Sequence, residues 1–304
     1  MTGLKGGGVL VIGEALIDVV TPPVGSALEH VGGSPANVAL GLARLGIPVR
    51  FRTALGPDVR GERIAGHLAA SGVVVDPASF VLDRTATAIA HLDPDRSARY
   101  EFDIQWRIDG PIALGGAGVV HVGSLGCYLE PGAETVRGFV RHVAGRARVT
   151  FDPNIRPALV HDRAAARRAT EEIAAMSDLV KLSDEDAGWL YPGVSPQAVL
   201  QGFLARGARV VAMTLGRRGA VLASREASVE IDGRPVVVQD TVGAGDSFMA
   251  ALVSCQASGL LGTGADSLRA AGTFAVAAAS VAVGRRGADL PTRAEIDHAS
   301  VIST

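Results

Sequence analysis

Cysteine is scarce in this chain. Of the 304 residues only Cys127 and Cys255 are cysteines, and neither stands in a Cys-x-x-Cys pair or at a zinc-binding spacing from histidine. Because the two lie far apart in the sequence, we expect both to be small, buried residues of a reduced protein. Neither a disulfide framework nor a metal site follows from them.

Long hydrophobic runs are also missing. The first apolar run, Val9–Ile12, is followed by Glu14 and Asp18, which interrupt it before it could serve as a signal peptide. The most apolar late segment, residues 270–284, is shorter than the ~20 residues of a membrane span. We expect a buried helix there, and a soluble cytoplasmic protein with no membrane partner.

Charge of one sign does not dominate. The chain has 29 basic and 31 acidic residues, which gives no support for nucleic-acid or anionic-membrane binding. Apolar residues make up 48% and charged residues 20%, as in a globular enzyme, and this composition excludes a disordered chain.

A GxxxxGK[ST] loop and a GxGxxG fingerprint are both absent, so a P-loop nucleotidase and a dinucleotide-dependent dehydrogenase lose their motif support.

What is present is an alternation of short apolar runs with amphipathic stretches. The runs are rich in β-branched residues and end in polar or glycine-containing turns, as buried parallel strands do. The pattern predicts a doubly wound α/β fold with a mainly parallel sheet flanked by helices, in which ligands collect at the carboxyl ends of the strands. Asp152, Lys181 and Thr214 lie at such ends. The predicted strands are Val9–Ile12, Val119–Gly123, Val149–Asp152, Leu179–Leu182 and Val210–Leu215.

The clearest helix signal follows a pair of glycines. Ser34 is predicted as the N-cap, Pro35 as the first helical residue and Gly46 as the C-cap. Residues 85–103 break the alternation, because they form two alternating stretches joined by the turn Asp93-Pro94-Asp95-Arg96. We expect an antiparallel hairpin there, with Tyr100, Phe102 and Ile104 on one face, that forms a small sheet outside the main one with the strand after Leu16.

A glycine-rich turn near the C-terminal end runs directly into a helix, in the sequence Asp240-Thr241-Val242-Gly243-Ala244-Gly245-Asp246-Ser247-Phe248. The amides of Gly243, Ala244 and Gly245 are expected to be unpaired at the helix N-terminus, where the helix dipole suits a phosphate oxyanion. Asp246 is positioned to accept a proton from a hydroxyl while these amides hold developing negative charge. The alternative is a turn with a carboxylate that only complements the dipole.

A second glycine-rich turn lies far upstream, in Gly32-Gly33-Ser34-Pro35-Ala36-Asn37 and the helix that follows. With this pair of motifs, in this order, the chain resembles the ribokinase-like sugar kinases, the family of the B-type phosphofructokinases, and within it the fructokinase branch. The resemblance extends from Gly13-Glu14 to about Gly284. It implies one sugar-kinase domain over residues 1–304, with a small β-sheet lid formed by residues of about 15–32 and 84–108.

The resemblance assigns roles to residues at both turns. It makes Asp246 the general base and the amides from Gly243 to Asp246 the anion hole. Sugar hydroxyls would be bound by Asp18, Gly32, Gly33 and Asn37, and a carboxylate and an amide can indeed hydrogen-bond vicinal diols. The segment Asp152-Pro153-Asn154-Ile155-Arg156 resembles a family motif near the sugar and the phosphates, which places Asn154 and Arg156 in the site.

The nucleotide side is expected at Lys181 and in the loop Thr214-Leu215-Gly216-Arg217-Arg218-Gly219, where Thr214, Gly216 and Gly219 would approach ATP. A plain hairpin between two strands explains the same glycines. Where many relatives have an Asn-x-x-Glu motif linked to magnesium, this chain has Ser183-Asp184-Glu185-Asp186. MgATP is therefore expected, with Asp186 as an indirect metal contact at most, and a monovalent cation is expected near Asp240.

The residue after the two glycines bears on the substrate. Relatives that bind a phosphate usually have Lys there, whereas this chain has Ser34, so a neutral sugar fits better than a sugar phosphate. We expect transfer from MgATP to a primary hydroxyl of a small sugar, with fructose first. The alternatives are a 2-keto-3-deoxygluconate kinase, a riboside kinase, or a sugar- or nucleotide-sensing protein without catalysis. A homodimer through the lid is expected as well.

Overall fold

The computed structural model describes residues 8–22, 25–92 and 98–301. Within these residues the body of the molecule is a nine-stranded sheet in the order β13-β12-β11-β10-β9-β8-β1-β4-β5. The strands from β11 to β5 are parallel, and β12 and β13 add an antiparallel edge. The doubly wound, mainly parallel sheet predicted from the sequence is confirmed. The strands are β1 Val9–Ile12, β4 Val49–Arg52, β5 Val74–Val75, β8 Val119–Gly123, β9 Arg148–Asp152, β10 Leu179–Ser183, β11 Val210–Thr214, β12 Gly219–Ser224 and β13 Ser228–Asp232.

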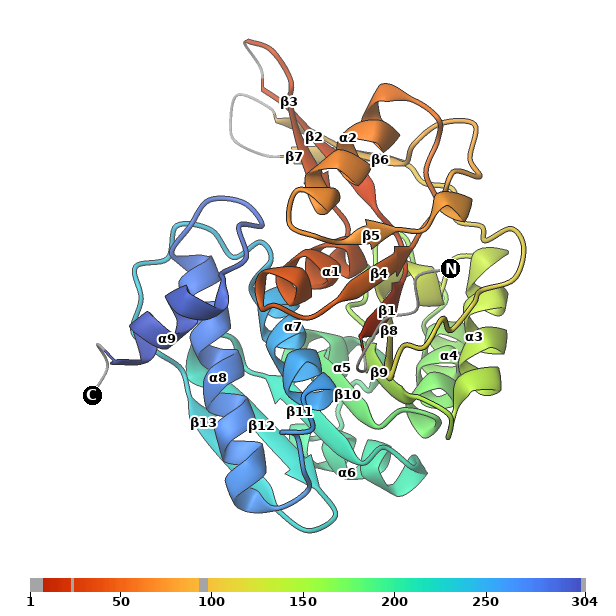
Figure 1. Ribbon diagram of the computed structural model, residues 1–304. Helices are drawn as coiled ribbons and strands as arrows, with labels where there is room; N and C mark the ends of the chain where they lie inside the picture. Colours follow the sequence, from red (N-terminus) through yellow and green to blue (C-terminus); the bar gives the residue numbers. More distant parts are fainter. Residues whose placement is uncertain (1–7, 23–24, 93–97, 302–304) are drawn as a thin grey trace.

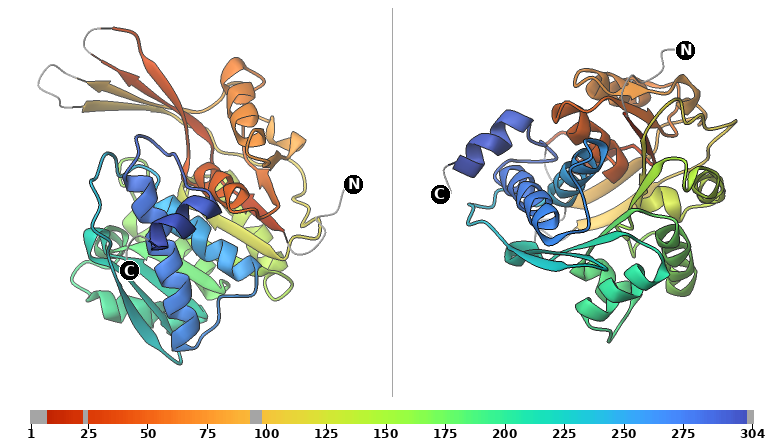
Figure 2. Two further views of the ribbon diagram at one scale, coloured as in Figure 1. Left: turned by 60° about the vertical axis from the view of Figure 1, so that its left-hand side comes forward. Right: turned by 60° about the horizontal axis from the view of Figure 1, so that its bottom comes forward.

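Helices cover both faces of the sheet (Figures 1 and 2). One face packs against α1, α2, α7, α8 and α9, and the opposite face against α3, α4, α5 and α6. Because the central strands are buried on both sides, they are nearly continuous in apolar residues. The helices are α1 Ser34–Arg44, α2 Val59–Ala69, α3 Gly132–Val143, α4 Arg163–Ala175, α5 Asp184–Leu190, α6 Pro196–Arg206, α7 Ala244–Ala257, α8 Ala265–Val283 and α9 Arg293–Val301.

The order of the strands reverses between β1 and β8. From β1 the chain first builds β4 and β5 on one side, and then returns to build β8, β9, β10 and β11 on the other. In an open α/β sheet a ligand crevice forms at the carboxyl ends of the strands next to such a reversal. The residues that follow β1 and β8, from Gly13 and from Ser124, therefore mark the expected site.

A second sheet projects from the body at the top of Figure 1. It has the order β3-β2-β6-β7, from β2 Leu16–Thr21, β3 Leu28–Gly32, β6 Thr87–Leu92 and β7 Ala98–Asp103. The predicted hairpin is β6 and β7, although its turn, Asp93 to Arg96, lies outside the described residues. Strand β3 adds an antiparallel neighbour to β2, and β2 pairs with β6 in parallel, so this sheet is mixed.

Helix α1 begins differently from the prediction. Ser34 is not the N-cap; it is the first helical residue, and Gly33 takes the N-cap position at φ 101° without any side-chain cap. The prediction of Gly46 as the C-cap is also off by one residue, because Leu45 is the C-cap and Gly46 follows it at φ 82°. The Ser34 hydroxyl is thereby left for a tertiary contact.

Two smaller expectations concern apolar residues. Cys127 and Cys255 are both free and buried, as predicted. The late apolar segment forms the buried helix α8, whose inner face packs against the sheet. Over the described residues, none of the helices combines the length and the apolar character that crossing a bilayer would require.

Candidate active site

The side chain of Asp246 lies where two helices begin. Asp246 is in the first turn of α7, and residues of the first turn of α1 hold both of its carboxylate oxygens. Ser34 Oγ donates to Oδ1 at 2.6 Å, and Asn37 Nδ2 donates to Oδ2 at 2.8 Å. The sequence predicted Asn37 as a sugar ligand, and its observed contact is with Asp246. The two glycine-rich motifs therefore meet at one carboxylate.

The two helices are held close together below the projecting sheet (Figure 1). A Cβ on Gly41 of α1 would lie 2.8 Å from the Cβ of Ala250 in α7, so only glycine permits this approach. Because the contact lies within both helices, it fixes how their first turns face each other. The geometry at Asp246 is set by this packing.

The turn before α7 has the form of an anion site. Gly243 is the N-cap of α7 in the left-handed region, at φ 78°, so the amides of the following residues point out of the helix start. Ala244 departs from the prediction, because its amide donates to the Thr241 carbonyl at 3.3 Å. Gly245 lies next to the ammonium group of Lys181, because a Cβ added at Gly245 would lie 3.2 Å from Lys181 Nζ.

Lys181 is a buried cation below this turn. Its Nζ donates to Asp152 Oδ2 at 2.9 Å, and both side chains are almost completely buried. Burial alone would lower the pKa of Lys181, but Asp152, Asp186 and Asp246 raise it, so the ammonium stays charged. Burial raises the pKa of Asp152 to about 6, with Lys181 acting in the opposite direction. Lys181 is charged on both sides of that pH, and above it the ionised Asp152 carboxylate pairs with the ammonium beside the glycine turn.

The other predicted sugar residues lie in the projecting sheet and in the turn that enters α1. Asp18 is on β2, and Gly32 ends the neighbouring β3, where a Cβ would collide with the Asp18 carboxylate. Gly33 adopts φ 101°, and a Cβ there would lie 2.7 Å from the Glu14 carbonyl. Burial raises the pKa of Asp18, opposed by the charges of His30 and Arg156. The two glycines are thus needed to bring Asp18 and the start of α1 together.

Asn154 and Arg156 follow the end of β9. Asn154 has φ 38°, which is rare for a residue other than glycine, and its amide donates to Ser124 Oγ at 3.4 Å. Ser124, after β8, also has a positive φ, 53°. Two strained residues in contact at the strand reversal are typical of a functional site. Arg156 is exposed, and its charge acts on both Asp18 and Glu14.

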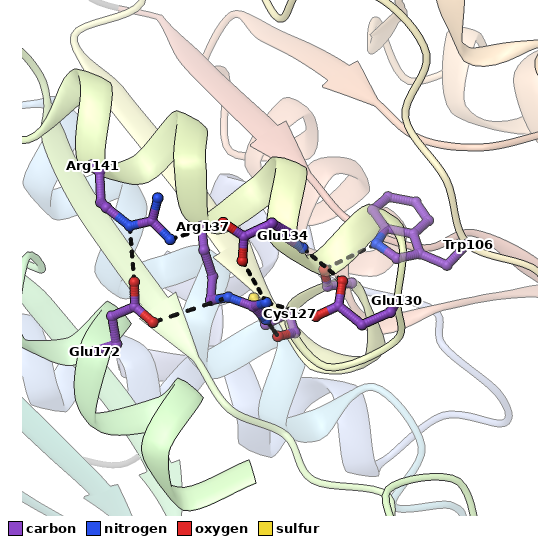
Figure 3. A network of polar contacts seen from close by, with 8 residues as sticks. Trp106, Cys127, Glu130, Glu134, Arg137, Arg141 and Glu172 are labelled. Carbon is purple, nitrogen blue, oxygen red and sulfur yellow. Dashed lines mark hydrogen bonds and ion pairs between the residues drawn. The ribbon is translucent and has the colours of Figure 1, made fainter. Parts of the chain in front are cut away.

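The sequence did not assign a role to Glu14. Its carboxylate is buried and accepts from the amide of Gly126 at 2.9 Å, in the short 3-10 turn Ser124–Cys127. The indole of Trp106 donates to the Gly126 carbonyl at 2.9 Å, and Arg137 donates to the Cys127 carbonyl at 3.4 Å (Figure 3). Three parts of the chain therefore hold the turn that carries Ser124. They are Glu14 after β1, Trp106 after β7 and Arg137 in α3.

Glu14 predicts a dependence of stability on pH. Burial raises its pKa from 4.5 to about 7, with opposing effects from Ser124, the Gly126 amide and Arg156. The folded chain therefore holds a proton on Glu14 that the unfolded chain loses above about pH 4.5. As the pH rises from 4.5 to 7, this group makes the folded state less stable, by up to about 3 kcal/mol.

Glu14→Gln removes this titration and keeps the side-chain shape. We expect the free energy of unfolding of the wild type, relative to that of the Gln variant, to fall as the pH rises through this range. Urea unfolding at several pH values measures the difference, and the comparison cancels the other titrating groups. A difference that does not change with pH would show that Glu14 does not titrate there.

The predicted nucleotide residues lie in the hairpin between β11 and β12. Thr214 ends β11 and pairs with Ser183 at the end of β10, two residues beyond Lys181. Gly216 is exposed, at φ 56°, with no atom near an added Cβ. Gly219 is held by packing, because a Cβ there would collide with the Ile231 carbonyl of β13. Thr214 and Gly216 are free to approach a ligand, whereas the glycine at position 219 is required by the hairpin itself.

The two acidic residues considered for metals are engaged in local contacts. Asp186 forms a capping box with Ser183 at the start of α5 and accepts from the Ile155 amide at 2.8 Å. Asp240 accepts from the amides of Val242 at 3.0 Å and Gly287 at 2.9 Å. Across the described residues, His, Cys, Asp and Glu side chains do not gather in any group of three or more that could hold a metal ion. Within the part of the chain that the structure describes, the buried Asp152 Oδ1 has no hydrogen-bond partner.

Comparisons with known proteins agree with this geometry. The family model described as pfkB family carbohydrate kinase matches residues 8–295. A fructokinase of Rhizobium leguminosarum bv. trifolii is 31% identical over 258 residues, which are 81% of this chain and 78% of the relative. A fructokinase from Xylella fastidiosa with bound ATP has a similar structure, with a TM-score of 0.84 and 26% identity, over 97% of this chain and 98% of that one. A fructokinase of Vibrio cholerae O395, crystallised with fructose, ADP and a calcium ion, has a TM-score of 0.80 and 25% identity, over 96% and 98% of the two chains.

Proposed function

Because the chain belongs to the pfkB family of carbohydrate kinases, we propose that it transfers the γ-phosphate of ATP to a primary hydroxyl of a small neutral sugar, with fructose as the first candidate. The observation that carries this proposal is the position of Asp246. Its carboxylate lies at the N-terminus of α7, directly after the glycine turn and beside the sugar-side helix α1. A base and an anion site are thus adjacent.

In the proposed reaction Asp246 accepts the proton of the sugar hydroxyl. The sugar oxygen forms a bond to the γ-phosphorus, the bond from that phosphorus to the bridging oxygen breaks, and ADP leaves. The amides at the start of α7 and the ammonium of Lys181 are placed to stabilise the negative charge of the transferred group. Asp18, Asn154 and Arg156 orient the sugar by binding the hydroxyl groups of the sugar.

Magnesium is proposed to arrive with the nucleotide. The start of α7 fits a polyphosphate, because Gly243 and Gly245 add no side chains there and the Lys181 ammonium lies beside Gly245. A divalent ion would be held chiefly by phosphate oxygens and water, and the buried Asp152 Oδ1 is a candidate protein acceptor. The monovalent cation is proposed to bind near the Asp240 carboxylate. That carboxylate already accepts hydrogen bonds from the amides of Val242 and Gly287, in two different loops. A cytoplasmic location is part of the same proposal.

Two observations support a neutral sugar, and fructose in particular. The residue after the two glycines is Ser34, which has a neutral hydroxyl in the site. An enzyme that binds a sugar phosphate would need a cationic side chain at this position. Several of the similar proteins are named fructokinases, one of them crystallised with fructose and ADP, and one other is named an ATP-dependent 6-phosphofructokinase. The competing proposals are a 2-keto-3-deoxygluconate kinase, a riboside kinase and a sensor that binds without turnover.

One screen separates these proposals. ADP release is measured with MgATP and each of fructose, glucose, ribose, 2-keto-3-deoxygluconate and nucleosides. We expect the highest kcat/KM with fructose. A higher value with another acceptor would replace fructose in the proposal, and binding without ADP release from any of them would favour the sensor.

The projecting sheet is proposed to be a lid that also joins two subunits. Partners across the strands share a face, so Asp18, Ala88 and Phe102 point to the same side. The opposite side is buried against the body at Ile17 and Val19 of β2, whereas Glu101 of β7 on that side is exposed. Tyr100 is 66% exposed and stacks on Phe102, which leaves an aromatic surface that a second copy would cover in an isologous contact.

Phe102→Asp is expected to give a folded monomer with a raised KM for the sugar, because the lid loses its support on the side of Asp18. Light scattering and steady-state kinetics measure the two effects. Glu101→Ala, on the other face of the same strand, is the matched control and should leave both unchanged. A wild-type protein that is monomeric at micromolar concentration would contradict the dimer.

A further inference from the structure

The hydroxyl of Ser34 has no role in capping α1. A serine beside a helix start usually accepts a bond from a backbone amide, but Gly33 is the N-cap here and no side-chain cap is formed. The hydroxyl instead donates its proton to Asp246 Oδ1 at 2.6 Å, across 212 residues of sequence. This distance is that of a strong hydrogen bond to a carboxylate.

Asp246 is enclosed by the two donors from α1. The exposed fractions of Ser34, Asn37 and Asp246 are 8%, 7% and 9%. Each carboxylate oxygen receives one of the donors, the amide of Asn37 on Oδ2 and the hydroxyl of Ser34 on Oδ1. The two donors differ in mobility. The Ser34 hydroxyl can turn away from Asp246 by rotation about one side-chain torsion angle, whereas the amide of Asn37 is positioned by two torsion angles.

Ser34 also has the chemistry of the acceptor. The Ser34 side chain, CH2OH, is a primary alcohol whose hydroxyl donates a hydrogen bond to the Asp246 carboxylate. A primary hydroxyl of the sugar must donate to the same carboxylate before the phosphoryl group is transferred. We propose that Ser34 Oγ holds the place of the acceptor hydroxyl on Asp246 Oδ1 in the sugar-free enzyme, and that the sugar replaces it. The inference rests on the proposed function, in which Asp246 is the general base.

The consequence is protection against water. A nucleotide bound beside an uncovered carboxylate is open to hydrolysis, because a water molecule on Oδ1 would be activated in the same way as the sugar. With Ser34 on Oδ1 that position is filled until a sugar arrives. Deleting the hydroxyl leaves room next to Asp246 Oδ1 and Asn37, where polar partners for a water are present.

The test compares Ser34→Ala with Ser34→Thr, which retains a hydroxyl. In Ser34→Ala we expect the release of ADP and inorganic phosphate without sugar to rise at least ~10-fold, since base activation of a nucleophile contributes ~10²- to 10⁴-fold. The KM for fructose should stay equal or fall, because no hydrogen bond to Ser34 must be broken first. Ser34→Thr should hydrolyse ATP as slowly as the wild type, and Ser34→Ala/Asp246→Asn should return to that low rate.

A supporting role alone predicts a different result. If Ser34 only positions Asp246, its loss lowers kcat with fructose and leaves hydrolysis without sugar within twofold of the wild type, and that result overturns the proposal. Ser34→Gly is a second hydroxyl-free variant in case the Ala variant does not fold. If the wild type phosphorylates no sugar, the proposed function fails regardless of Ser34; if it does and hydrolysis does not rise in either variant, only this inference fails.

Discussion

Asp246→Asn is expected to lower kcat for sugar phosphorylation by ~10²- to 10⁴-fold, the contribution of a positioned general base. The amide has the shape of the carboxylate but cannot accept the sugar proton at neutral pH. Sugar binding should change little, because the contacts of Asp18 and Arg156 are untouched. Steady-state kinetics with fructose and MgATP measure the effect, and a variant with more than a third of the wild-type kcat would remove Asp246 from the mechanism.

The contact between Asn37 and Asp246 offers a control for folding. In Asp246→Asn two amides face each other, whereas Asn37→Asp/Asp246→Asn restores one carboxylate and one amide in exchanged positions. We expect this double variant to unfold at a temperature near that of the wild type and to remain inactive. Activity in the double variant would show that a carboxylate on either helix can serve as the base.

Asp18→Ala is expected to raise the KM for the sugar at least ~10-fold and to leave the KM for ATP nearly unchanged. Hydrogen bonds to a charged group contribute about 1.5 to 3 kcal/mol each, which corresponds to about 10- to 100-fold in affinity. Gly32 makes room for this carboxylate, and Arg156 lies close enough to act on it electrostatically. The prediction follows from the proposed role of Asp18 as a sugar ligand.

His30→Ala is the matched control for Asp18. His30 is paired with Asp18 across β2 and β3 and is exposed, so its loss leaves the strands in place. We expect it to change the sugar KM far less than Asp18→Ala does. Equal increases of both KM values in Asp18→Ala would indicate misfolding or an exchanged assignment of the two substrate sides.

The main sheet could be predicted because its strands carry their signal locally. A strand buried on both faces, such as β8, is a short apolar run wherever it occurs. Strand β4 was not predicted, because Arg50 and Arg52 interrupt it. Arg52 is buried nonetheless, with its guanidinium 3.5 Å from Asp76, and nothing in the neighbouring sequence indicates that burial.

The site was predictable where the backbone fixes it. The glycine turn before α7 places Asp246 in the first helical turn whatever surrounds it, and this part of the prediction agrees with the structure. Ser34 and Glu14 depend on partners 212 and 112 residues away, so their roles could not be deduced from local preference. For Ser34 the local preference was misleading, since a serine before Pro35 is a typical N-cap.

The most direct measurement of the central claim is the product formed from fructose and MgATP. Phosphorus NMR of the reaction should show one sugar monophosphate, esterified at a primary hydroxyl, for each ADP released, and Asp246→Asn should form it at least ~100-fold more slowly. Release of ADP with inorganic phosphate alone, or no loss of ATP with any of the sugars, would contradict the account.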